Sequence, residues 1–288
     1  QFVLKYNLKA QIDSFNAITG IYTKKIFCEL LGFDESSLRN AEPMKDFNGK
    51  HPDPNLTYAA ELVNLVMPKD SPYDIGFAFD GDCDRCIAVD GNGNVVDGDA
   101  IMYILAKRLK SRGMLNKNTV VATIMSNSGF IQSLDEAGIK CAQTTVGDRF
   151  VYECMQTNNF SLGGEQSGHI IFRDFSTTGD GQLTALQVLQ IMKKTDKSLS
   201  QLASCMTVYP QTMINIRVSD MGKARFSDDE EIRIAIRQAE EQLGESGRVL
   251  VRVSGTEPLV RVMLEGQDQT RIEILAEEIA EVIRKRLI

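Results

Sequence analysis

The stretch TVVATIMSNSGFIQSLDEAGIKCAQTTV, residues 119–146, decides the fold class of this chain. It opens with a short run of apolar and β-branched residues, and apolar residues then recur at helical spacing over 129–138. A second short strand pattern closes the stretch at 140–146. A strand, a helix of about ten residues and another strand indicate a βαβ unit with parallel strands.

Further elements extend this pattern in both directions, and a break in it falls near residue 206. Helices are expected over 20–32, 56–67, 100–113, 148–156, 181–194 and 228–243 and at the C-terminus, and strands over 73–80, 248–254 and 259–266, with a hairpin over 86–99. We therefore predict an α/β protein. Two α/β domains with mixed, mainly parallel sheets are expected over 1–98 and 99–206. A small C-terminal α+β domain is expected over 207–288, with the order strand, helix, strand, strand and helix.

Composition restricts the classes of function. The 39 acidic and 32 basic residues give a net charge of −7, which argues against nucleic-acid partners because phosphate-backbone binding needs a basic face. No apolar run approaches the roughly 18 residues of a membrane-spanning helix, and the opening residues lack a signal-peptide layout. The six cysteines indicate no disulfide framework, and the C-x-x-C pair Cys83 and Cys86 lacks a second pair of zinc ligands. We expect a cytoplasmic protein without membrane partners, and the initial Gln1 indicates a piece of a longer chain.

The loop FDGDCDR places three aspartates at alternate positions directly after a predicted strand. In a tight turn the carboxylates of Asp80, Asp82 and Asp84 can converge, and their repulsion favours a hard divalent cation between them. Ligands that are all oxygen favour Mg²⁺ over zinc or copper. The EF-hand pattern fails, because arginine and glycine occupy its sixth and twelfth positions. A solvated acidic turn is the alternative, but the guanidinium of Arg85 beside the carboxylates favours a phosphate-handling centre.

The segment RVLVRVSGTEPLVR consists of a predicted strand, a Ser-Gly-Thr turn and a second strand. Its turn combines backbone N–H groups, hydroxyls and guanidinium groups, which together suit a phosphate dianion. The candidate phosphate-binding residues are Arg252, Ser254, Gly255, Thr256 and Arg261. A β-hairpin turn with solvated arginines is the alternative, and the chain contains no Walker pattern.

The polar segment LGGEQSGHIIF contains a carboxylate, an amide, a hydroxyl and an imidazole between glycines. Glu165 and Ser167 alternate along the chain, so their side chains can point the same way and bind neighbouring hydroxyls of a sugar. His169 can donate to a phosphate or a ring oxygen, although a lone histidine on a strand edge is more often structural. Together the three loops predict sites for magnesium, a phosphate and a polyol.

The three loops resemble those of the α-D-phosphohexomutases. FDGDCDR, GGEQSGH and RVSGTEPLVRVMLEG match, in order and spacing, the metal-, sugar- and phosphate-binding loops of that family, over nearly the whole chain. The resemblance implies a protein of four domains around one deep cleft. A phosphoserine in the first domain would give its phosphoryl group to a hexose phosphate, and the reoriented bisphosphate would return the other phosphoryl group.

The resemblance also implies a role for each loop. The three aspartates would hold Mg²⁺, and Arg85, as a catalytic residue, would lie near the phosphoserine. Glu165 and Ser167 would bind sugar hydroxyls with His169 close by, and the candidate phosphate-binding residues would hold the phosphate that does not react.

The sequence departs from the family pattern in several places. The family nucleophile lies in a Thr-Ala-Ser-His-Asn-Pro segment, and no Ser-His pair occurs in the 288 residues. We therefore expect that the chain lacks the first domain, which would supply the phosphoserine, and that it is inactive alone. Cys83 replaces the usual glycine of the metal loop, and Val253 stands where phosphoglucosamine mutases usually have proline.

The expected function is that of a phosphohexose mutase, interconverting hexose 6-phosphate and hexose 1-phosphate. TTVGDRFVYE and TTGDGQLTALQVL resemble bacterial phosphoglucosamine mutases, which favours glucosamine phosphate as substrate, whereas FNGKHPDPNLTYAAELV resembles eukaryotic-type phosphoglucomutase. Two alternatives stay open: a phosphoglucomutase acting on glucose phosphate, and a non-catalytic relative that binds a phosphosugar or acts as a scaffold.

Overall fold

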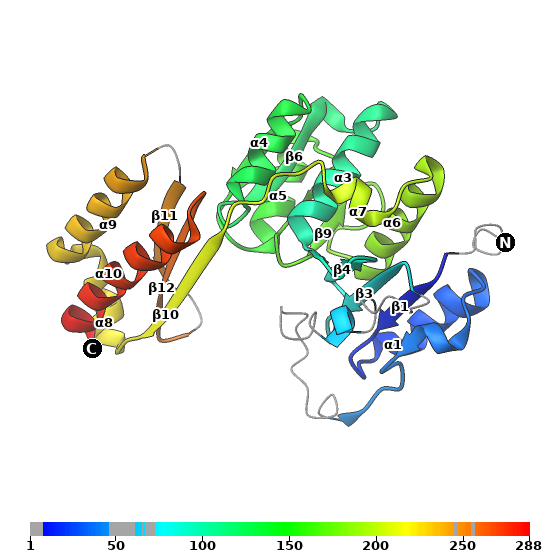
Figure 1. The fold of residues 1–288 in the computed structure, drawn as a ribbon, viewed down its shortest axis with the longest axis horizontal. Coiled ribbons are helices and arrows are strands. Elements are labelled where there is room, and N and C mark those ends of the chain that lie inside the picture. The colour runs from blue at the N-terminus through cyan, green and yellow to red at the C-terminus, as the bar shows by residue number, and fades with distance from the viewer. Residues whose placement is uncertain (1–7, 46–60, 65, 67–72, 245–246, 255–256) are drawn as a thin grey trace. The chain divides into compact units, whose positions relative to one another are not determined.

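The computed structural model describes residues 8–45, 61–64, 66, 73–244, 247–254 and 257–288 (Figure 1). The chain forms two compact units, Gln1–Thr207 and Val208–Ile288, called here the first and the second unit. Most of the helix predicted over 56–67 lies outside the described residues.

The first unit contains a mixed sheet that carries the acidic loop, residues 80–85, which is also called the metal loop here. In the described part of the unit, its strands are β1 (Ala10–Asp13), β2 (Leu38–Arg39), β3 (Ile75–Phe79), β4 (Cys86–Asp90) and β5 (Val95–Val96), in the order β2-β1-β3-β4-β5. β1 runs parallel to β2 and β3, whereas β3 and β4 form an antiparallel pair, as do β4 and β5. The acidic loop connects β3 to β4 at one edge of this sheet, and the parallel strand β1 ends at the same edge.

The helix predicted over 20–32 is present, but only its first part is an α-helix. α1 (Thr19–Thr23) continues directly into a π-helix, Lys24–Leu30, and the chain leaves it through Gly32, whose φ is 84°. A φ in this range costs glycine little, because glycine has no Cβ.

The second sheet of the first unit is built around the βαβ stretch and has the predicted parallel pairing. Among the described residues its strands are β6 (Thr119–Thr123), β7 (Lys140–Thr144), β8 (Leu162–Gly164) and β9 (Ile170–Phe172), in the order β7-β6-β8-β9. β6 runs parallel to β7 and β8, and only the β8–β9 hairpin is antiparallel. The turn of this hairpin, residues 165–169, is called the sugar loop here.

Most of the helices that follow α1 in the first unit begin at a polar side-chain cap. The described ones are α3 (Gly98–Ser111), α4 (Ser128–Glu136), α5 (Asp148–Asn158), α6 (Gly181–Thr195) and the short α7 (Leu199–Ala203), of which α5 begins at Gly147 without a side-chain cap. Side chains of Asp97, Asn127 and Asp180 accept hydrogen bonds from the first turns of α3, α4 and α6, which satisfies N–H groups that have no partner within the helix.

One hydrophobic core runs through both sheets of the first unit. It includes Phe77 on β3, Ile101 on α3, Val120 on β6 and Leu189 on α6, and the first three are fully buried. Because this core is shared, the loops at the ends of the two sheets are held against each other by packing as well as by hydrogen bonds.

The second unit has the predicted order of strand, helix, strand, strand and helix, with an additional short helix. Its described elements are β10 (Gln211–Arg217), α8 (Asp220–Arg225), α9 (Glu230–Leu243), β11 (Gly247–Val253), β12 (Leu259–Gly266) and α10 (Gln269–Leu287). The three strands form an antiparallel sheet in the order β10-β12-β11. Val260, Val262 and Leu264 alternate along β12 and are buried in a core with α9 and α10.

The observed architecture confirms the α/β fold class. Strands β1 and β2 and the β8–β9 hairpin were not predicted, because each is too short for a periodic pattern. The domain boundaries at 98 and 206 stay a prediction. Within the described residues, no helix combines the length and the apolar character that crossing a membrane requires.

Candidate functional site

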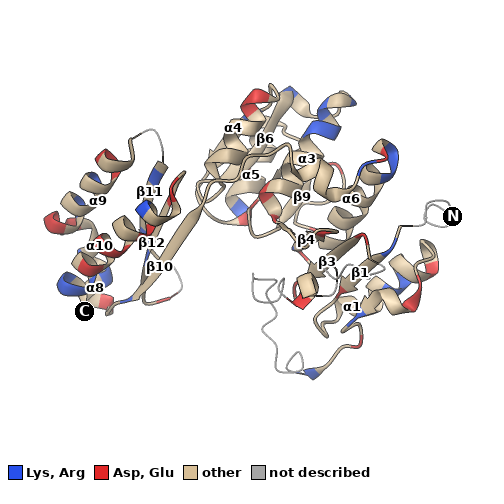
Figure 2. Cartoon of the chain, viewed as in Figure 1, with Lys and Arg blue, Asp and Glu red and all other residues tan. Residues whose placement is uncertain are grey.

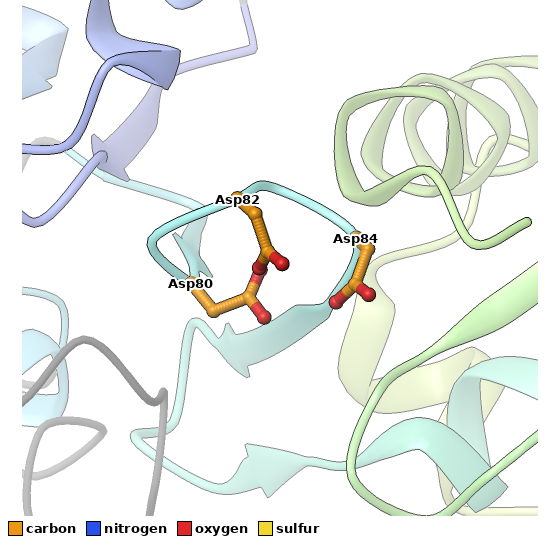
Figure 3. A group of neighbouring side chains, drawn as sticks. All are labelled: Asp80, Asp82 and Asp84. Carbon is orange, nitrogen blue, oxygen red and sulfur yellow. The ribbon is translucent and has the colours of Figure 1, made fainter. Parts of the chain in front are cut away.

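The three aspartates of the acidic loop converge, as the sequence predicts. Carboxylate oxygens of Asp80, Asp82 and Asp84 lie within 4.8 Å of one another, and Figure 3 shows the three side chains around one turn. Cys83 stands at the bend with φ 62°, a left-handed conformation that non-glycine residues adopt at some cost. The bend brings the three side chains to one side of the loop.

The electrostatics of this loop are unfavourable without a cation. Burial and the neighbouring Asp84 and Asp82 raise the pKa of Asp80 to about 8, although the backbone N–H of Arg85 donates to it over 3.0 Å. The guanidinium Nε of Arg85 lies 3.7 Å from Asp80 and 3.8 Å from Asp84, which offsets part of the negative charge. A divalent ion would offset the remainder.

The donor set fits a hard cation. Oδ1 of Asp84 is buried and accepts no hydrogen bond from the described residues, so it remains available as a ligand. Burial raises the pKa of the Cys83 and Cys86 thiols, which therefore stay protonated and are poor metal ligands. Oxygen ligands without thiolates are the set that Mg²⁺ prefers.

The sugar loop forms a tight turn between β8 and β9. The backbone N–H of Glu165 donates to the carbonyl of His169 over 2.9 Å, and the N–H of Gly168 donates back to Glu165 over 3.0 Å. Glu165 is half-buried and Ser167 is exposed, so the loop offers a carboxylate and a hydroxyl to solvent at alternate positions.

The carboxylate of Glu165 is oriented by a residue that the site prediction missed. The backbone N–H of Gly147, directly before α5, donates to Oε1 of Glu165 over 2.9 Å. One oxygen of Glu165 is thereby fixed, and Oε2 is left to accept from a ligand. Gly147 does occur in the segment TTVGDRFVYE, which carried the family resemblance.

The start of α3 supports the sugar loop from behind. The backbone N–H of Gly98 donates to the carbonyl of Gln166 over 3.0 Å, and the amide of Gln166 reaches Oδ2 of Asp97 at 3.3 Å. A Cβ on Gly98 would lie only 2.1 Å from the carbonyl oxygen of Glu165. The close approach therefore requires glycine at this position.

The metal loop and the sugar loop are joined through their backbones. Arg85 and His169 form an antiparallel β-bridge, and the N–H of Cys86 donates to the carbonyl of Gly168 over 3.0 Å. On the other side, the N–H of Gly181 donates to the carbonyl of Cys83 over 2.8 Å. Two loops about 80 residues apart in sequence thus form one connected structure.

His169 is buried and faces the metal loop. Its Nε2 lies 3.4 Å from Oδ2 of Asp84 and accepts from the backbone N–H of Gly179 over 3.2 Å. Its Nδ1 has no hydrogen-bond partner among the described residues. The contact of His169 with a substrate stays a prediction.

The phosphate loop belongs to the second unit. Arg252 and Arg261 are directly opposite each other in the β11–β12 register, and like charges in this position repel. Arg261 pairs with Glu257, and buried Ser254 accepts from the N–H of Glu257 over 3.3 Å. Gly255 and Thr256 lie outside the described residues. An anion would relieve the repulsion between the two arginines.

Comparison with known protein families identifies three consecutive matches. The alpha/beta/alpha domain II of phosphoglucomutase/phosphomannomutase matches residues 3–93, its alpha/beta/alpha domain III matches 97–209, and its C-terminal domain matches 213–282.

Similar proteins include bacterial phosphoglucosamine mutases. That of Caldanaerobacter subterraneus subsp. tengcongensis is 53% identical over 231 residues, covering 80% of this chain and 51% of the relative. That of Clostridium kluyveri is 47% identical over 281 residues, covering 98% of this chain and 61% of the relative. The chain thus spans about half to three-fifths of the length of these curated relatives.

Solved structures share the fold at low identity. Aspergillus fumigatus N-acetylphosphoglucosamine mutase, in complex with GlcNAc-6P and magnesium, has a TM-score of 0.78 and 18% identity, covering 98% of this chain and 62% of its own. A phosphoglucomutase/phosphomannomutase family protein from Burkholderia thailandensis has a TM-score of 0.77 and 20% identity, with 98% and 62% covered.

Magnesium affinity is expected to rise with pH. Below the pKa of about 8, Asp80 holds a proton that must leave before its carboxylate can bind Mg²⁺. The apparent Kd should therefore increase by up to about tenfold for each pH unit below 8. Isothermal titration with Mg²⁺ between pH 6.5 and 8.5 measures this slope.

The control is Asp135→Asn, which neutralises an acid on α4 outside the cluster and should leave the slope unchanged. Asp80→Asn should remove most of the dependence of the Kd on pH and should weaken the binding of Mg²⁺. A Kd independent of pH in the unsubstituted protein would contradict the assigned proton competition.

Gly168→Ala should destabilise the first unit more than Gly113→Ala does. Both glycines have positive φ, 95° and 68°, but a Cβ on Gly168 would lie 2.4 Å from the carbonyl oxygen of Cys86, whereas one on Gly113 meets nothing within 4 Å. Measured by urea unfolding, the free energy of unfolding should fall by about 1–3 kcal/mol more for Gly168→Ala than for Gly113→Ala. Equal costs for the two substitutions would show that the contact between the loops is not tight.

Proposed function

The chain belongs to the phosphoglucomutase/phosphomannomutase family, and from this premise we propose that it is the metal-, sugar- and phosphate-binding part of a phosphohexose mutase. The reaction proposed for the whole protein interconverts hexose 6-phosphate and hexose 1-phosphate. The single observation that supports this most strongly is the backbone connection between a triple-aspartate loop and a polar sugar loop.

We propose Mg²⁺ as the ion held by Asp80, Asp82 and Asp84. The raised pKa of Asp80 and the buried oxygen of Asp84 support a cation at this point. When bound, Mg²⁺ neutralises charge that develops on a transferred phosphoryl group. The magnesium complex of the A. fumigatus enzyme is consistent with this assignment.

The chain's own residues would position the substrate. Arg85, fixed beside two carboxylates, would present positive charge to the reacting phosphoryl group. Glu165, with one oxygen held by Gly147, would accept hydrogen bonds from sugar hydroxyls, and exposed Ser167 would add a hydroxyl donor. His169 is proposed to act close to the sugar from beside Asp84.

The phosphate that does not react is proposed to bind in the second unit. The opposed arginines Arg252 and Arg261 supply charge that a dianion would neutralise, and Ser254 supplies a hydroxyl. Gly255 and Thr256 remain part of this proposal from the sequence alone.

Glucosamine phosphate is the substrate that the comparisons favour, since the relatives at 53% and 47% identity are named phosphoglucosamine mutases. The phosphoserine nucleophile is proposed to come from a domain outside these residues, because no Ser-His pair occurs here. The chain alone is therefore expected to bind a hexose phosphate without converting it. A glucose phosphate mutase is the second candidate.

Binding of glucosamine 6-phosphate and glucose 6-phosphate to the chain, measured by calorimetry with Mg²⁺ present, tests the roles of the two loops. Each hydrogen bond from an arginine to the phosphate should contribute about 1.5–3 kcal/mol to binding. Arg252→Ala should therefore raise the Kd of both sugar phosphates by about 10–150-fold. Glu165→Ala should instead change the ratio between the two sugars, because its carboxylate contacts hydroxyls.

Arg237→Ala is the matched control, since this arginine pairs with Glu230 on the exposed face of α9 in the same unit. It should leave both Kd values unchanged. If Arg252→Ala shifts the sugar preference as strongly as Glu165→Ala does, the assigned roles are wrong. Conversion of either sugar by the purified chain would contradict the missing nucleophile.

A further inference from the structure

The first unit has a cavity that neither loop of the proposed active site lines. It lies between α3, α6 and α7, has a volume of about 190 Å³, and contains no residue of the metal or the sugar loop. Its walls combine an apolar base with a basic rim. The base is formed by Ile104 and Ile191, both buried, and by the half-buried Leu202.

Three cations line this cavity, and no acidic side chain does. They are Lys107 and Arg108 on α3 and Lys197, two residues after the end of α6. Figure 2 shows basic residues at the ends of both helices. Within the described part of the chain, none of the three has a carboxylate within the 4.0 Å of an ion pair. Although the chain has a net charge of −7, the cavity lining therefore carries a local positive charge that favours an anion.

One of these cations is already held in place. The ammonium of Lys107 lies 3.4 Å from the hydroxyl of Tyr103 and 4.9 Å from the centre of its ring. The Tyr103 hydroxyl in turn donates to the backbone carbonyl of Cys205 over 3.1 Å. This arrangement connects α3 to the segment after α7 and lowers the entropy that Lys107 would lose on binding an anion.

Stabilisation of helix ends explains only part of the basic cluster. Basic residues in a last helical turn interact favourably with free carbonyls, which accounts for Arg108 on α3 and for Lys193 and Lys194 on α6. Lys107 lies before the last turn of α3, and Lys197 follows the last residue of α6. Interaction with the helix ends therefore does not account for Lys107 and Lys197, whereas a bound anion would account for both.

We propose that this cavity binds a small phosphomonoester through the three cations, with its carbon skeleton on the apolar base. A phosphomonoester carries up to two negative charges, which suit a guanidinium and two ammonium groups better than a single carboxylate does. The volume is below the range of about 300–1,000 Å³ that holds drug-sized ligands, so the ligand is compact. This inference does not depend on the proposed mutase activity.

Cys205 provides a reporter for the site. It lines the cavity and is the exposed member of the six cysteines. Alkylation of Cys205 by neutral iodoacetamide, followed by peptide mass spectrometry at constant ionic strength, measures occupancy by glycerol 3-phosphate. Saturable protection of at least about fivefold is expected, with weaker protection by inorganic phosphate and acetate.

The double variant R108Q/K197Q should lose this protection, to less than about twofold. The matched control Lys194→Gln removes an exposed cation of α6 that does not line the cavity, and it should keep full protection. The proposal is overturned if the unsubstituted protein shows no saturable protection, or if the double variant is protected equally. Equal protection by acetate would overturn the phosphate class, and equal protection by inorganic phosphate would overturn the role of the apolar base.

Discussion

The structure of the candidate site depends on the short backbone contact between the metal loop and the sugar loop. The N–H of Cys86 donates to the carbonyl of Gly168, and Arg85 and His169 form a β-bridge at the same point. Backbone hydrogen bonds fix position more firmly than contacts between long side chains do, because fewer rotatable bonds separate the groups. We therefore expect a movement of the aspartates to be transmitted to the turn that carries Glu165.

The acidic loop and the phosphate loop of the chain carry opposite charge. The acidic loop raises the pKa of Asp80, whereas the second unit opposes Arg252 and Arg261 across one strand pair. A cation would reduce the repulsion between the carboxylates, and an anion would reduce the repulsion between the two arginines. A cation and a phosphate are the pair of ligands that the proposed phosphoryl transfer needs.

The sequence predicted most of the regular elements and the convergence of Asp80, Asp82 and Asp84, because periodicity and alternate spacing are local signals. It did not predict that the N–H of Gly147 orients Glu165, or that Gly98 supports the loop from behind. Those contacts join residues 18 and 68 positions apart, and in each the donor is the backbone N–H of a glycine, which leaves no pattern in the side chains. The short strands β8 and β9 were missed for a similar reason, since a strand of three residues shows no clear alternation of apolar and polar residues.

Hydrogen exchange of the backbone amides, with and without saturating Mg²⁺, tests the connection between the two loops most directly. We expect Mg²⁺ to slow exchange in residues 80–86 and also in residues 165–169, where the N–H of Gly168 belongs to the sugar turn, with no change in α9 of the second unit. Slower exchange confined to residues 80–86 would contradict the account, because it would show that the metal loop moves independently of the sugar loop.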